Sequence, residues 1–284
     1  MQLKDTFNRS LHSAKIILSL VIPIYIIAEI LYYYNTLSYI SFLVEPFTSI
    51  LGLPAEASLS IISGMFLNLY AAIAFAAPLD MSIKEWSVLG VFLGIAHSLV
   101  VEGAILKKLN VSLKYSFFLR LIAGIVVGYF TSLLPDSFFH STMVSNTFSK
   151  TEYSSLKELL IHSFYNATIL AIKIVVLITI LIVLMDFLKS FLTKNVSKPF
   201  IIIVGIILGI TSGAGILIAE SKNISKKDMF FIITFLMICH AVIEDTLLFV
   251  IFGADFWLIV GIRAVFGVLI AYLISYFFYK NIQK

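Results

Sequence analysis

Charged side chains are scarce in this 284-residue chain, because Asp, Glu, Lys and Arg together make up only 13% of it. About 25% is usual in a soluble domain, so the composition excludes an ordinary soluble protein. Cysteine is nearly absent, and the single Cys239 excludes both an intrachain disulfide and a cysteine metal site. The chain has no basic cluster, phosphate loop, nucleophile motif or metal triad. We therefore expect no nucleic-acid partner, no cofactor, no bound metal and no enzymatic activity.

Apolar residues make up 60% of the chain, and its mean hydropathy is +1.04. One membrane-spanning helix needs about 20 such residues, so the length allows about eight to ten spans. The net charge of +4 comes from lysines at the ends and in short connections, where it bears on topology and lipid headgroups. The sequence predicts an all-α, polytopic membrane protein.

Eight apolar runs predict helices, near residues 16–34, 57–77, 86–106, 115–134, 165–185, 199–219, 229–252 and 256–279. Two shorter segments, 39–54 and 186–199, contain prolines or lysines and are interpreted as re-entrant, interfacial or short spans. The first run resembles a signal peptide, but it is long for one and no cleavage site follows. We expect it to be retained as a helix.

A polar connector at 136–164 divides the chain into a first half, 1–135, and a second half, 165–284. With one constant shift, which takes Lys84 to Lys227, "KEWSVLGVFLGIAHSLVVE" aligns with "KDMFFIITFLMICHAVIED", and "FLRLIAGIVVGYF" aligns with "GIRAVFGVLIAYL". Further upstream, a slightly larger shift aligns Gly64 with Gly213. Apolar residues align easily, but four matches of polar residues or glycine at one shift indicate an internal duplication, which is frequent in transporters. The two halves are inverted or parallel, and the first-half lysines favour inverted.

Buried charges occur at equivalent places in the two halves. Glu102 and Arg120 flank one turn at equal distances, and Asp245 and Arg263 flank another turn with the same separation. Residues equidistant from the turn of an antiparallel helical hairpin lie at the same height. We therefore predict two ion pairs, Glu102 with Arg120 and Asp245 with Arg263. Such pairs either fix the packing of the helices or face a cavity and exchange partners during transport.

Two histidines accompany these charges. His240 and Glu244 are four residues apart, which predicts that they share a helix face, whereas the position four after His97 is Val101. A structural histidine, a proton or substrate contact and a metal ligand are the alternatives, and two ligands without a third are weak support for metal.

Two further ionisable residues lie in apolar runs. The spacing of Glu29 and Lys173 nearly equals the shift between the halves, so we predict that they meet across the axis relating them. Extension of Lys173 to the membrane surface is the alternative. Small residues at 52–65 and 209–220 indicate close helix packing or, alternatively, helix breaks that line a substrate site.

The order of a short amphipathic piece, "GLPAEA", a helix with "SGM", a helix with "HSLVVEGAIL" and a helix with an arginine resembles the Gate domain, also called the nucleoside recognition domain. This domain occurs in spore maturation proteins, in the membrane part of FeoB-type ferrous iron transporters and in relation to concentrative nucleoside transporters. The resemblance covers most of both halves. It implies an inner-membrane protein with paired Gate units and a permease-like role. The chain contains neither a GTPase segment nor the nucleoside-transporter glutamine or glutamate motif, so neither iron nor nucleosides follow as substrates.

These observations predict a multi-pass transporter or permease of the cytoplasmic (inner) membrane. A small solute or ion would bind between the halves, near the residues His97, Glu102, Arg120, His240, Glu244, Asp245 and Arg263. The alternatives are a Gate-type scaffold that binds a second copy or another membrane protein, and an enzyme acting on a lipid-linked substrate. Whichever of these functions it has, we expect the protein to lie in the lipid bilayer.

Overall fold

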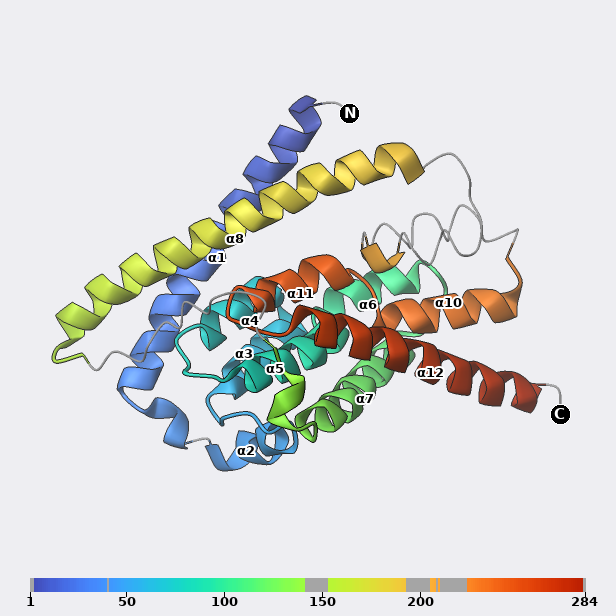
Figure 1. Cartoon of the computed structure of the whole chain (residues 1–284), viewed down its shortest axis with the longest axis horizontal. Coiled ribbons are helices and arrows are strands. Elements are labelled where there is room, and N and C mark those ends of the chain that lie inside the picture. Colours follow the sequence, from blue (N-terminus) through green and yellow to red (C-terminus); the bar gives the residue numbers. More distant parts are fainter. Residues whose placement is uncertain are drawn as a thin grey trace.

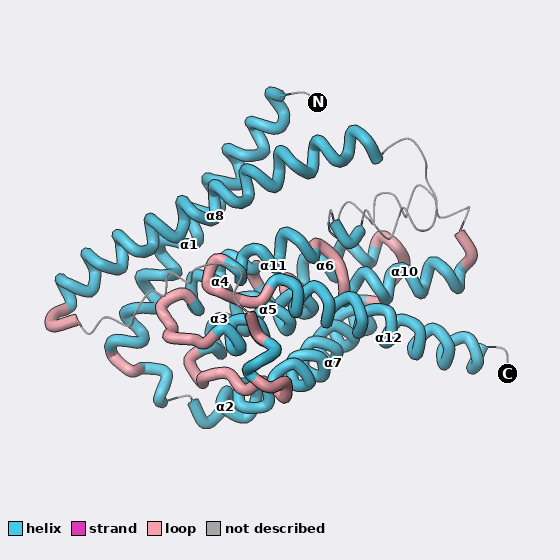
Figure 2. The backbone as a smooth tube through the Cα atoms, viewed as in Figure 1, coloured by secondary structure: helices cyan, strands magenta, loops and turns pink. Residues whose placement is uncertain are grey.

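The computed structural model describes residues 3–39, 41–140, 153–192, 205–207, 209 and 224–282. Within these ranges the chain is helical and has no strand, as Figure 2 shows. Six helical segments of this described part are long and apolar enough to cross a membrane: Lys4–Tyr33, Ile83–Lys107, Leu113–Ser132, Leu156–Phe187, Lys226–Val250 and Phe256–Phe278. The predicted all-α, polytopic class is confirmed.

Two long helices, α1 (Leu3–Tyr33) and α8 (Leu156–Leu192), pack against each other and extend beyond the other helices (Figure 1). They run antiparallel, because Arg9 near the start of α1 pairs with Asp186 near the end of α8. Thr6 donates a hydrogen bond to the same carboxylate at 2.6 Å. Because α8 begins at Leu156, the last part of the predicted connector is helical, and residues 141–152 of it lie outside the described residues.

The region after α1 is made of short helices. After a 3-10 turn, η1 (Thr36–Tyr39), comes α2 (Ser41–Ile50), which is too short to span a membrane. The single helix predicted at 57–77 is wrong, because α3 (Ala57–Phe66) and α4 (Leu69–Ala76) are separate. Asn68 caps α4 by accepting a hydrogen bond from the Ala71 amide at 3.0 Å. The two helices fold against each other, since a Cβ built on Gly64 would lie 3.0 Å from the Cβ of Ala72.

The first hairpin is built from α5 (Ile83–Ala96), α6 (Leu99–Lys107) and α7 (Leu113–Ser132). A capping box between Ser82 and Glu85 starts α5. After α7, a 3-10 turn, η2 (Asp136–Phe138), lies beside the start of α5, where Lys84 pairs with Asp136 at 3.1 Å.

The second hairpin consists of α10 (Lys226–Ile238), α11 (Val242–Val250) and α12 (Phe256–Ile282). Ser225 caps α10 by accepting from the Asp228 amide at 3.1 Å, and Asp255 caps α12 by accepting from the Leu258 amide at 2.9 Å. The predicted helix at 199–219 lies mostly outside the described residues, as does the later part of the segment at 186–199.

The two hairpins pack together in opposite directions. Trp86 near the start of α5 stacks on Phe252, after the end of α11, with ring centroids 4.3 Å apart. One turn later along α5, a Cβ built on Gly90 would contact Phe249, which precedes Phe252 in the chain. Helix α5 therefore runs antiparallel to α11, as α1 runs antiparallel to α8. This is the orientation expected of inverted rather than parallel units.

Candidate functional site

The membrane-spanning segment that begins each hairpin is interrupted. Helix α5 ends at Ala96 with His97 as its C-cap, and Ser98 then adopts the left-handed conformation with φ 47° and ψ 38° before α6 begins. Helix α10 ends at Ile238 with Cys239 as its C-cap, and Ala241 adopts φ 45° and ψ 31° before α11 begins. The continuous helices predicted at 86–106 and 229–252 are therefore wrong. Ser98 aligns with Ala241 at the same shift that aligns His97 with His240, so the two breaks are at equivalent positions.

Each break is held by the carbonyl of a glycine. The Ser98 amide donates to the Gly64 carbonyl at 2.8 Å, and the Ala241 amide donates to the Gly205 carbonyl at 3.4 Å. Both glycines lie against a leucine side chain, where a Cβ would come within 2.6 Å and 2.5 Å of it respectively. Gly205 thus has the contacts of Gly64, whereas Gly213, which the sequence alignment matched with Gly64, lies outside the described residues.

Arg120 of α7 closes the first break. Its side chain is fully buried, and it donates to the carbonyls of Ile95 and His97 at 2.7 Å each. Its Nη1 lies 2.7 Å from Oε2 of Glu102, which confirms the predicted pair. The positive guanidinium therefore binds the last carbonyls of α5, which carry a partial negative charge. The negative Glu102 lies in the first turn of α6. Both charges have the sign that a helix end favours at these places.

Arg263 of α12 closes the second break in the same way. It is fully buried and donates to the carbonyls of Ile238 at 3.4 Å and His240 at 2.7 Å. Its Nη2 lies 3.4 Å from Asp245, so the second predicted pair is also confirmed. One contact has no counterpart among the described contacts of the first hairpin: Arg263 also donates to the Gly94 carbonyl of α5 at 2.6 Å. This bond joins the two hairpins.

The two histidines meet at the contact between the hairpins. Their ring centroids are 5.3 Å apart. The Nε2 atom of His97 lies 3.1 Å from Glu102, and that of His240 lies 3.2 Å from the same carboxylate. Glu102 therefore contacts both hairpins, whereas the sequence predicted partners only within each hairpin.

We call His97, Glu102, Arg120, His240, Asp245 and Arg263 the charge cluster. The structure brings these six predicted residues together, and every one of their side chains is at most 13% exposed. Glu102 is the most exposed of them.

Glu244 is arranged differently from the prediction. The interruption at His240 and Ala241 removes the regular spacing of four residues, so His240 and Glu244 do not share a helix face. His240 contacts Glu102 instead. Glu244 is half-buried in the first turn of α11, and Asp245, His97 and Tyr70 lie close enough to interact with it electrostatically.

Three residues of the charge cluster lie close enough together to hold a metal ion. One ligand atom each from His97, His240 and Asp245 lies within 4.8 Å of the others, and all three residues are buried. This third group was missing from the sequence argument. Arg120 and Arg263, however, already neutralise the two carboxylates of the cluster, so a divalent ion would add two positive charges to a cluster whose own charges balance.

Glu29 and Lys173 lie on the packed pair α1 and α8, at different heights. Thr6 of α1 is level with Asp186 of α8, and the Tyr25 hydroxyl lies against Asn166. These contacts place Lys173 level with about residue 19 of α1, about 15 Å along the axis from Glu29. Such a separation disfavours the predicted direct pair, and the side chain of Glu29 lies against the hydroxyls of Tyr25 and Tyr153.

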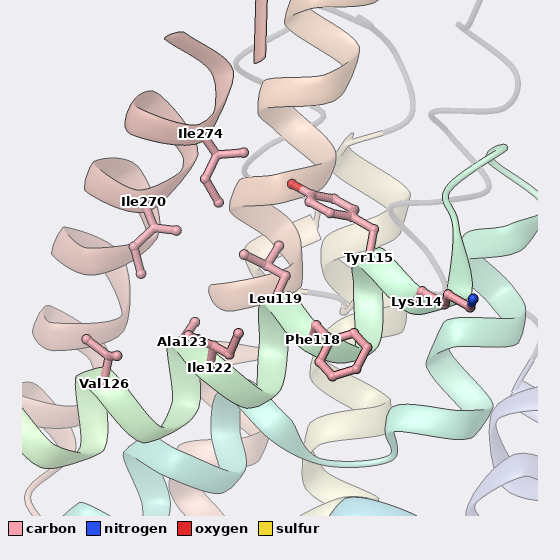
Figure 3. A pocket seen from close by; sticks show the side chains of 9 residues that line it. All are labelled: Lys114, Tyr115, Phe118, Leu119, Ile122, Ala123, Val126, Ile270 and Ile274. Atoms are coloured by element: carbon pink, nitrogen blue, oxygen red, sulfur yellow. The ribbon is translucent and has the colours of Figure 1, made fainter. Parts of the chain in front are cut away.

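A groove of about 530 Å³ lies between α7 and α12 (Figure 3). Its lining is almost wholly apolar, with Lys114 and the Tyr115 hydroxyl near one end: the residues are Lys114, Tyr115, Phe118, Leu119, Ile122, Ala123, Val126, Ile270 and Ile274. No member of the charge cluster lines it, so this groove is separate from the candidate site.

Sequence reasoning missed three parts of the site. The contact between His240 and Glu102 depends on how the hairpins pack, and no spacing within one hairpin indicates it. The bond from Arg263 to Gly94 involves a carbonyl, which every residue has. A signal was available only for the breaks, because a residue type common to both units at His97 and His240 suggested a special position in each helix.

No family model matches the chain, and no solved structure matches it. The chain is similar to the uncharacterized membrane protein YvoD of Bacillus subtilis (strain 168). The two are 25% identical in an alignment 284 positions long, which covers 90% of this chain and 88% of that protein. Together with the six apolar helices, this similarity identifies the chain as a membrane protein with several transmembrane helices.

Proposed function

We propose that this membrane protein is a transporter for a small solute or ion, which binds at the charge cluster between two related, inverted units. The observation that carries the proposal is the meeting of two interrupted helices at one buried cluster. Irregular backbone at membrane depth is found where it is buried in protein or lines a site, and broken helices at a repeat interface form the binding sites of many transporters.

The contacts of the two hairpins support a common origin of the units. Leu93, Ile95, His97 and Glu102 of the first hairpin make the same kinds of contact as the residues that align with them in the second. A duplicated and inverted unit is a recurring basis for alternating access, in which one unit moves against the other around a fixed site. The resemblance to the Gate domain points the same way and favours the cytoplasmic membrane as the location.

Glu102 supports a role in transport rather than in packing alone. A carboxylate that served only its own hairpin would need only Arg120, yet Glu102 also contacts His97 and His240. A change in the relative position of the hairpins would break the contact with His240. The occupancy of the site and the arrangement of the units would then be linked.

The competing function is a scaffold that binds a second copy or another membrane protein without moving a solute. One observation favours it: both arginines bind backbone carbonyls at the helix breaks, so the charges also stabilise the fold. An enzyme would need a reacting group, and our proposal assigns the cluster to binding rather than catalysis.

The test starts with a thermal-shift screen of the purified protein against nucleosides, nucleobases, amino acids and divalent cations, followed by uptake of each hit into proteoliposomes. A ligand present at about 100 times its Kd stabilises the folded state by about 2.7 kcal/mol. We expect at least one compound to raise the Tm and to be taken up. Glu102→Gln should reduce both effects at least about tenfold. The matched control Glu56→Gln changes an exposed carboxylate that makes no capping bond, and it should have no effect.

Uptake equal to that of protein-free vesicles for every compound, with no rise in Tm, would refute the transporter. A search for bound membrane proteins would then follow from the scaffold alternative.

A further inference from the structure

We infer that His97, Glu102 and His240 form a binding site for one exchangeable proton, shared between the two hairpins. The inference rests on the proposed function and names the coupling ion of that transporter. It depends on which atoms can donate a hydrogen bond.

The Nδ1 atoms of both histidines are already engaged. Nδ1 of His97 lies 2.8 Å from the Leu93 carbonyl, and Nδ1 of His240 lies 2.7 Å from the Leu236 carbonyl. A carbonyl oxygen only accepts hydrogen bonds, so each Nδ1 must carry a proton and donate it. In a neutral imidazole, the other nitrogen, Nε2, then has a lone pair and no proton.

Both Nε2 atoms face the Glu102 carboxylate. The distances are 3.1 Å from His97 and 3.2 Å from His240. Arg120 lies 2.7 Å from the same carboxylate and favours its ionised form, in which both oxygens are acceptors. Two lone pairs would therefore point at an acceptor group over hydrogen-bonding distances. At least one additional proton among these three side chains turns a repulsive contact into a charge-assisted hydrogen bond.

The charges around the site favour a single proton over a divalent metal ion. Arg120 balances Glu102 and Arg263 balances Asp245, so these four groups sum to zero. A proton adds one positive charge, whereas a divalent ion adds two beside both guanidiniums. A proton also fits the existing distances without movement of any side chain.

In the part of the chain that the structure describes, four further titratable groups face this site from the surrounding elements. Glu244 and Asp245 lie in the first turn of α11, Cys239 is the C-cap of α10 near Arg263 and Asp245, and Tyr70 of α4 faces Glu244 and Asp245. Glu244 is a carboxyl of the described residues that lies close enough to His97 to balance the added proton. Glu102, at 13% exposure, gives the proton its most direct contact with the outside of the cluster.

The proton would link the site to the movement of the hairpins. When the shared proton lies on Nε2 of His240, it holds the first hairpin to the second, and its loss leaves two acceptors in contact. Protonation therefore favours the closed contact between the units, and deprotonation favours their separation. A proton-coupled transporter requires such a dependence.

The test reads the protonation state directly. The chain has five histidines, so the ¹⁵N spectrum of histidine-labelled protein in lipid nanodiscs is simple enough to assign with His97→Gln and His240→Gln. The control His12→Gln removes an exposed histidine of α1. At pH 7 we expect both cluster rings to carry a proton on Nδ1 and one of them to carry a second proton on Nε2. In Glu102→Gln, whose amide can donate to Nε2, both rings should be neutral.

Two results would overturn the inference. The first is two neutral rings in the wild-type protein, a measurement that does not require any variant to fold. The second concerns chelator-treated protein to which one equivalent of Zn²⁺ is added. If the extra proton is then lost and both Nε2 signals shift, the site binds a metal ion instead. Neither measurement needs transport: neutral rings in an active transporter refute only the proton site, and a protonated cluster in a protein that moves nothing refutes only the function.

Discussion

Replacing Arg120 by Met tests whether the charge cluster is energetically coupled. Arg120 is fully buried, and its guanidinium donates to two backbone carbonyls and forms an ion pair with Glu102. Its loss leaves a buried carboxylate without its closest cation, which costs about 3–5 kcal/mol. The unpartnered end of α5 adds about 1 kcal/mol. We expect Arg120→Met to lower the free energy of unfolding by about 4–6 kcal/mol.

The double variant separates the charge from the packing. Glu102→Gln alone should cost about 1–2 kcal/mol, because the guanidinium keeps its hydrogen bonds to the two carbonyls. Arg120→Met with Glu102→Gln removes both charges, so it should cost only about 2–3 kcal/mol. The coupling energy is then about 4 kcal/mol, above the range of about 0.5–3 kcal/mol for most residues in contact.

The measurement is unfolding in mixed micelles of dodecyl maltoside and SDS, followed by tryptophan fluorescence. The chain has two tryptophans. Trp86 is buried and stacked on Phe252 between the hairpins, whereas Trp257 is 73% exposed. The fluorescence change therefore reports mainly on separation of the hairpins. If the costs of the two single variants add within about 0.5 kcal/mol, the reasoning on this pair is wrong.

The equivalent double-mutant cycle on Arg263 and Asp245 should give a smaller coupling energy. Their separation is 3.4 Å rather than 2.7 Å, and Arg263 donates to three carbonyls. Most of the stabilisation by Arg263 should therefore come from backbone contacts. We expect a coupling energy below about 1 kcal/mol, although Arg263→Met alone should destabilise as strongly as Arg120→Met.

The ion pairs could be predicted from the sequence because they depend on local geometry. Equal distance from a turn fixes the relative height of two residues in any antiparallel hairpin. That rule held for Glu102 with Arg120 even though the helix carrying Glu102 is interrupted. The interruption lies beyond the carboxylate as seen from the turn, so it does not alter the counting.

The interruptions themselves could not be predicted from the usual signals. Neither His97–Ser98 nor His240–Ala241 contains glycine or proline, the residues that mark most helix breaks. What stabilises each break is distant in sequence: a glycine carbonyl from a preceding segment and an arginine from the following helix. Tertiary contacts thus overrode local helix propensity. The same break explains why the four-residue spacing of His240 and Glu244 wrongly predicted that the two share a helix face.

The remaining predictions concern backbone positions of the site, each measured as the free energy of unfolding in the same micelles. Gly94→Ala would place a Cβ 2.8 Å from the Arg263 guanidinium, and we expect a loss of about 1–3 kcal/mol. The control Gly261→Ala, where a Cβ meets nothing within 4 Å, should be neutral or stabilise by up to about 1 kcal/mol. Ala241→Gly should stabilise by about 1 kcal/mol, because φ 45° strains an alanine and not a glycine. The same substitution inside a helix, Ala123→Gly in α7, should instead destabilise by about 1 kcal/mol. Opposite signs for one chemical change would show that the second break belongs to the folded state in the membrane, whereas a loss at both positions would mean that the chain is helical through Ala241 and that the cluster is assembled differently.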